Sequence, residues 1–145
     1  MAQLRVLVDT NVVIDWLNAR QPWATEAKLL WESRDSGLVE LYLPASVLTD
    51  VFYILRKPLG NDGAKKAIER CVATCGLLPV DETIIRRALM LPGSDFEDNV
   101  HIACTLIYRI DLIVTRNPSD FTQGVTMPVI DPKEIARYLP PPTTP

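Results

Sequence analysis

Short, almost wholly apolar runs alternate along the chain with longer stretches in which apolar residues recur every third or fourth position. The short runs, rich in Val, Ile and Leu, are typical of buried strands, and the longer stretches are typical of helices with one apolar face. Proline and glycine close several helical stretches, as Pro58 and Gly60 do. The pattern predicts strands at 5–10, 39–44, 77–81, 111–115 and 127–131, and helices at 11–19, 23–36, 45–57, 61–74, 82–91, 95–109 and 132–139.

This alternation predicts an α/β fold, in which a central parallel sheet of four to five strands carries helices on both faces. A chain of 145 residues is long enough to bury the core of one domain. We expect that single domain at residues 1–139. The proline-rich tail at 140–145 lacks the apolar residues of a packed segment and is expected to be disordered.

Composition narrows the classes of function. The net charge of −3 and the isoelectric point of about 5.1 argue against a protein that holds nucleic acid by bulk positive charge. Cys71, Cys75 and Cys104 fall in predicted helical stretches without the spacing of a zinc site, so reduced core thiols are expected. The N-terminus enters a strand without a signal-peptide pattern, and no apolar run reaches membrane-spanning length. A cytoplasmic protein without membrane contact is therefore expected.

Acidic residues stand where a parallel sheet places its ligands, beyond the carboxyl ends of strands. Asp9 ends the first predicted strand, and Asp120 lies five residues after Thr115, the last residue of the fourth. Asp50 has mostly apolar neighbours within helix 45–57, where a buried carboxylate is costly unless it is compensated. An exposed helix face shared with Lys57 is an equally open alternative for Asp50.

The stretch DFEDNVHIACTL, residues 95–106, places three acids directly before an apolar helical pattern. Asp95 is a good N-cap, and acids in the first turn interact favourably with the helix dipole. Asp98 would then be the third helical residue, and its side of the helix lies close to the apolar stripe that contains Ile102. The local pattern alone favours a structural role for these acids and leaves Asp98 open.

Four stretches taken together resemble the signature blocks of PIN-domain proteins. They are DTNVVIDWL, ASVLTDVFYILRK, DFEDNVHIACTL and IVTRNPSDF, which occur in the family's order and span nearly the whole chain. The resemblance implies a PIN-like nuclease domain at 1–139 that acts as a metal-dependent ribonuclease. It also implies the toxin of a VapBC-type toxin–antitoxin pair, with a homodimer and a small antitoxin as expected partners.

Position by position, the resemblance places the acidic catalytic and metal-binding cluster on Asp9, Asp50, Asp98 and Asp120. It assigns supporting polar roles to Asn11, Thr115 and Asn117. One departure stands out, because the second acid of the family is more often Glu. The side chain of Asp50 is one methylene shorter than that of Glu, so its carboxylate extends less far toward a metal.

An all-oxygen cluster of this kind suits Mg²⁺ or Mn²⁺, which could supply the chemistry of phosphodiester hydrolysis in single-stranded RNA. His101 is the chain's one histidine, and we expect it on the helix surface or at a partner contact, ahead of a role as base. Candidates for binding RNA phosphates are Arg116, Arg56 and Lys57.

Two other interpretations compete with the ribonuclease. A phospho-acceptor receiver domain needs an adjacent acid pair after the first strand, an acceptor Asp ending the third and a Lys ending the fifth. The sequence offers a single acid in DTN, and its late lysine, Lys133, follows Pro132. The other interpretation is a PIN-like module that binds RNA or protein with weak or no cleavage, and the short second acid keeps it open.

Overall fold

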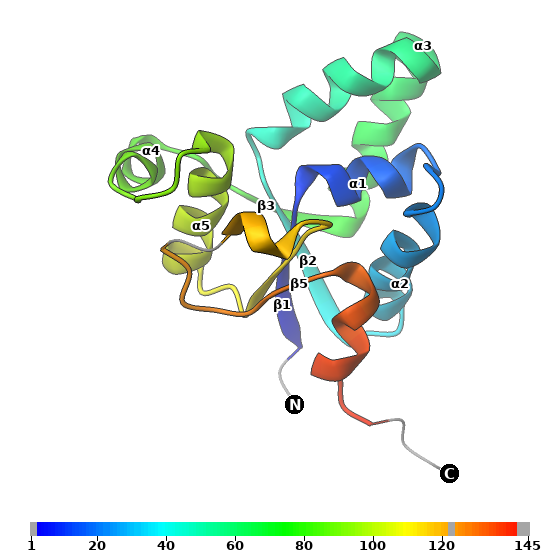
Figure 1. Cartoon of the computed structure of the whole chain (residues 1–145). Coiled ribbons are helices and arrows are strands. Elements are labelled where there is room, and N and C mark those ends of the chain that lie inside the picture. The colour runs from blue at the N-terminus through cyan, green and yellow to red at the C-terminus, as the bar shows by residue number, and fades with distance from the viewer. Residues whose placement is uncertain (1–2, 122–123, 142–145) are drawn as a thin grey trace.

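The computed structural model describes residues 3–121 and 124–141 and contains one five-stranded sheet. Every strand pair in it is parallel, and the spatial order is β3-β2-β1-β4-β5 (Figure 1). The expected α/β fold is therefore confirmed. The strands are β1 (Leu4–Val8), β2 (Val39–Pro44), β3 (Cys75–Leu78), β4 (Leu112–Val114) and β5 (Val129–Ile130).

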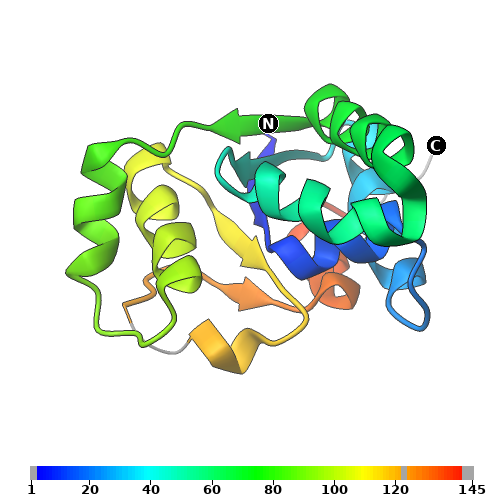
Figure 2. The same cartoon turned by 90° about the horizontal axis from the view of Figure 1, so that it is seen from above.

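Helices cover both faces of the sheet (Figure 2). Side chains of β1 alternate between two apolar clusters, as the pleat of a strand requires. Val6 and Val8 pack in the cluster formed with α1, α2 and α3, whereas Leu7 packs in the cluster formed with α4 and α5. The helices are α1 (Thr10–Leu17), α2 (Ala24–Asp35), α3 (Val47–Thr74), α4 (Glu82–Leu89) and α5 (Phe96–Tyr108), with 3₁₀ segments η1 (Pro118–Phe121) and η2 (Pro132–Tyr138).

Three local expectations change in the structure. Helix α3 is interrupted at Gly60, whose φ of 74° only glycine adopts easily, so the two helices predicted there meet end to end. Strand β3 begins at Cys75 and not at residue 77, because Cys75 pairs with Leu41 of β2. Cys75 is thus a strand residue, although all three cysteines are buried free thiols as expected. The last predicted helix is 3₁₀ in form.

The structure also bears on the expectations for the proline-rich tail and for membrane contact. Residues 140 and 141 have no regular structure, and residues 142–145 of the proline-rich tail lie outside the described residues, as do residues 1–2 and 122–123. None of the described helices combines the length and the apolar character that crossing a membrane requires.

Candidate active site

Strands β2 and β3 lie on one side of β1 in the sheet, and β4 and β5 lie on the other side. The order of the strands therefore changes direction between the neighbouring strands β1 and β4. Asp9 directly follows β1, and Thr115 directly follows β4. Asp9 Oδ1 accepts a hydrogen bond from the backbone N–H of Thr10 at 2.8 Å, and Asp9 Oδ2 accepts one from the Thr115 hydroxyl at 2.8 Å. Both strand ends therefore fix a carboxylate that is nearly buried, at the kind of switch point where parallel sheets bind ligands.

The first turn of α5 brings a second carboxylate to this edge. Asp95 caps the helix, and its carboxylate accepts the backbone N–H of Asp98 at 3.0 Å, which confirms the predicted N-cap. Asp98 and Asp120 line one hollow of about 290 Å³. The other residues of that hollow are Gly93, Ser94, Asp95, Asn99 and Ile102.

The loop after β4 ties Asp120 back to Asp9. The backbone N–H of Asn117 donates to the Thr115 hydroxyl at 3.3 Å, and the Asn117 carbonyl accepts the backbone N–H of Asp120 at 3.0 Å. Thr115 in turn donates to Asp9, so a short chain of hydrogen bonds connects the two acids. The backbone of Asn117 carries this connection, while its side chain is exposed.

The surroundings of Asp98 raise the pKa of its carboxyl group. Burial raises the pKa of Asp98 to about 6, and the neighbouring charges of Asp95 and Asp9 add to the increase, while His101 opposes it. A carboxyl group that resists ionisation beside other acids is typical of a functional site.

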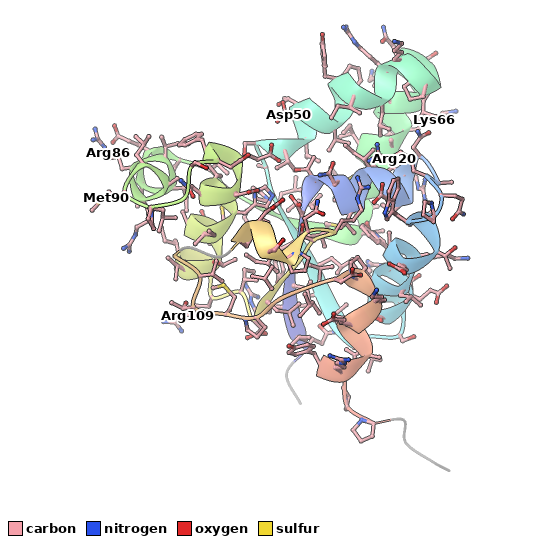
Figure 3. The ribbon with its side chains drawn as sticks, viewed as in Figure 1. Arg20, Asp50, Lys66, Arg86, Met90 and Arg109 are labelled. Atoms are coloured by element: carbon pink, nitrogen blue, oxygen red, sulfur yellow. The ribbon has the colours of Figure 1, made fainter. Side chains whose placement is uncertain are left out.

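Asp50 takes a different position from the other three acids. It is exposed on the first turn of α3, at the end of that helix nearest α5 (Figure 3). The exposed alternative that composition left open for Asp50 is therefore the observed one. Asp50 lines a neighbouring hollow, separate from that of Asp98 and Asp120, together with Thr10, Asn11, Tyr53, Ile54 and Glu97.

Comparison with known proteins decides the family. A sequence profile described as the PIN domain matches residues 5–119, more than half of the chain. The chain belongs to the PIN domain family. No curated protein sequence matches it significantly.

Solved structures share the fold of this PIN domain. VapC20 of Mycobacterium tuberculosis, a sarcin–ricin loop cleaving toxin, has a TM-score of 0.62 and 18% identity over 74% of this chain and 86% of its own. A DNA-bound VapBC of Salmonella typhimurium has a TM-score of 0.66 and 15% identity over 88% and 98%. A toxin–antitoxin complex of Klebsiella pneumoniae has a TM-score of 0.62 and 22% identity over 84% and 96%. At these identities the likeness concerns the fold.

Two further residues of the PIN domain, Glu97 and His101, lie close to the Asp9 carboxylate. His101 is completely buried, so its expected place on the helix surface or at a partner contact was wrong. Glu97, expected only as a first-turn acid, accepts a hydrogen bond from the Thr10 hydroxyl at 2.8 Å. The signal that could have found them is their spacing, because Glu97 and His101 are four residues apart and share one face of α5.

The three cations expected at RNA phosphates have different surroundings. Arg116 lies 3.1 Å from a carboxylate oxygen of the buried Asp15 and stacks over Trp23, so an internal ion pair already engages it. Burial raises the pKa of Asp15, an effect that Arg116 and a second arginine oppose. Arg56 is exposed and stacks over the Tyr53 ring, and Lys57 is exposed beside it. Of the three, Arg56 and Lys57 are therefore the ones that remain accessible, on the same helix as Asp50.

Proposed function

We propose that this PIN domain is an endoribonuclease that hydrolyses phosphodiester bonds of single-stranded RNA with the help of a divalent metal ion. The observation that carries the proposal is the placement of Asp9, Asp98 and Asp120 around one edge of the sheet, where the pKa of Asp98 is raised to about 6. Asp50 is proposed as the fourth acid, which would approach the same edge from α3, since it lines the neighbouring hollow. Membership in the PIN domain family supports the same activity.

The residues present suit a hard divalent cation. Carboxylate oxygens are the ligands that Mg²⁺ and Mn²⁺ prefer, and Asp9, Asp98, Asp120 and Asp50 would hold the ion. Burial raises the pKa of Asp98, and the charges of Asp95 and Asp9 raise it further; a bound cation would offset that repulsion. When bound, such an ion neutralises phosphate charge and lowers the pKa of water.

The chain's own residues orient the reacting groups. Thr115 and the N-terminus of α1 hold the Asp9 carboxylate in one orientation, so little reorganisation is needed when substrate binds. Arg56 and Lys57 are proposed to attract RNA phosphates toward the Asp50 side of the site. Asn11, exposed beside Asp50, is proposed as a polar contact there.

The same proposal includes a biological role as the toxin of a toxin–antitoxin pair that acts in the cytoplasm. Its support is the fold shared with structures described as a VapC toxin and as toxin–antitoxin complexes. A small antitoxin and a second copy of the chain are the proposed partners. A short reading frame of antitoxin size directly upstream would favour this role over a housekeeping nuclease.

A second candidate is a PIN module that binds RNA or protein and cleaves poorly. The observation in its favour is that Asp50 is short, exposed and placed in a separate hollow from Asp98 and Asp120. Turnover of RNA distinguishes the two functions, since binding alone leaves the substrate intact.

Metal removal is the first test of the proposed nuclease. The purified chain, free of any partner, is expected to cleave single-stranded RNA in Mn²⁺ or Mg²⁺ and to stop in excess EDTA, because the acidic site repels phosphate without a cation. Cleavage is measured by gel with a labelled oligonucleotide, and added Mn²⁺ should restore it. Cleavage at an undiminished rate in EDTA would exclude the metal-dependent mechanism.

A further inference from the structure

The imidazole of His101 has one satisfied and one unsatisfied nitrogen. His101 is fully buried, and its Nδ1 lies 2.7 Å from the Glu97 carbonyl oxygen. A carbonyl oxygen only accepts, so Nδ1 carries a proton, and a ring with that one proton presents a lone pair at Nε2. Within the described part of the chain Nε2 has no hydrogen-bond partner. A buried polar atom without a partner is costly, which indicates that something else occupies its open side.

The open side of Nε2 faces carboxylates. Asp9 Oδ1 lies 3.6 Å from Nε2, which is too far for a hydrogen bond. Ligand atoms of Asp9, Glu97 and His101 all lie within 4.8 Å of one another. Two ligands that each sit about 2.1 Å from one ion are roughly 3.0 to 3.4 Å apart at octahedral or tetrahedral angles. The 3.6 Å between Nε2 and Asp9 Oδ1 is close to this spacing, whereas ligand atoms as far apart as 4.8 Å must move closer when an ion binds.

We propose that His101 Nε2, Asp9 and Glu97 bind one divalent transition-metal ion, of the class of Mn²⁺, Co²⁺ and Zn²⁺. Each ligand is already oriented by a neighbour, as ligands of metal sites usually are. The Glu97 carbonyl accepts the Nδ1 proton of His101, and the Thr10 hydroxyl donates to the Glu97 carboxylate. Thr115 holds the other oxygen of Asp9.

This centre differs in chemistry from the all-oxygen site of the proposed function, with which it shares Asp9. An imidazole nitrogen favours Zn²⁺, Co²⁺ and Mn²⁺ over Mg²⁺, which prefers oxygen ligands and retains its waters. The inference thus adds a nitrogen ligand and a metal preference, and it rests on the proposed function only through Asp9. The competing account is that a protonated His101 acts as a counter-ion to Asp9 and Glu97 without any metal.

Nitrogen NMR of the wild-type chain separates these accounts, because His101 is the chain's one histidine and gives one pair of ring signals. The probe is ZnCl₂, added to untagged full-length protein labelled with ¹⁵N-histidine. We expect the Nε2 signal to move on Zn²⁺ addition, the Nδ1 signal to remain that of a protonated nitrogen, and EDTA to reverse the change. An equal concentration of MgCl₂ should move Nε2 much less. An Nε2 signal that stays protonated or unmoved at saturating Zn²⁺ would overturn the proposal.

Matched variants test the oxygen ligand. Glu97→Gln should weaken Zn²⁺ binding by about tenfold or more in calorimetry. Glu82→Gln is its control, because Glu82 occupies the first turn of α4 and pairs with Arg86 at the surface, away from Asp9. Equal affinities of the two variants would count against Glu97 as a ligand.

Failure of this inference and failure of the proposed function give different results. If Mn²⁺ supports RNA cleavage while Nε2 never moves with Mg²⁺ or Zn²⁺, the nitrogen ligand is wrong and the nuclease stands. If Nε2 binds Zn²⁺ but RNA stays intact in every metal, the metal centre stands and the nuclease is wrong. Both results come from wild-type protein, so the folding of a variant does not affect them.

Discussion

Asp98→Asn is expected to lower the rate of RNA cleavage by on the order of 100-fold or more, with little change in the fold. The substitution keeps the size of the side chain but removes an anionic oxygen from the hollow shared with Asp120. Asp9→Asn should have a similar effect, because Asp9 is fixed between the ends of β1 and β4. The measurement is initial cleavage rate in Mn²⁺, with circular dichroism to verify folding.

Asp95→Asn is the matched control within the same DFED stretch. Asn is also a good N-cap, so the hydrogen bond to the backbone of Asp98 should survive and most activity should remain. An inactive Asp95→Asn beside an active Asp98→Asn would show that the assignment of roles within this turn is reversed.

In the absence of metal, Asp98→Asn is expected to melt at a higher temperature than wild type, by a larger margin at pH 8 than at pH 4. The pKa of Asp98 is raised from 3.8 to about 6, so the folded state retains the proton longer than the unfolded state does. A group with a raised pKa contributes stability below about pH 4 and loses it as pH rises through about 6. The Asp98→Asn variant has no such loss, because an amide does not titrate in this range. Allowing for solvent screening, about 1 kcal/mol, or roughly 2 to 4 °C, is expected at pH 8.

Metal should reverse the order of the two proteins. A cation that binds only the native site adds stability that grows with its concentration, and the wild type offers one more anionic ligand. Thermal melting of both proteins at pH 4 and pH 8, in EDTA and in Mn²⁺, gives the comparison. Asp62→Asn, which changes an exposed acid of α3, is the control and should behave as wild type. A wild type as stable as Asp98→Asn in EDTA at pH 8, and unmoved by Mn²⁺, would mean that the acids do not share a site.

The architecture followed from the sequence because each strand and helix has a local signal. Buried parallel strands are continuous apolar runs, and Asp95 marks the start of α5 as its N-cap. The order of the strands explains why acids far apart along the chain come together, since β1 and β4 are neighbours only in space. The resemblance to PIN-domain proteins, more than periodicity, pointed to Asp98 as a candidate for the site.

The surroundings of His101 and Arg116 depend on tertiary contacts, which the local sequence pattern does not predict. His101 looks like a polar residue of a half-exposed helix, but the packing of α5 beside Asp9 buries it completely. Arg116 looks like a free cation, although the buried carboxylate of Asp15, far earlier in the chain, engages it. A single sequence does not reveal which long side chain meets which distant charge, so both placements became clear only in three dimensions.

The most direct test of the proposed ribonuclease is to express wild type and Asp98→Asn at equal levels in bacterial cells and to sequence the ends of the cellular RNA. Wild type should generate new RNA ends at defined positions that are absent with Asp98→Asn, because only the intact acidic site cleaves. An identical set of RNA ends with both proteins would contradict cleavage at this site.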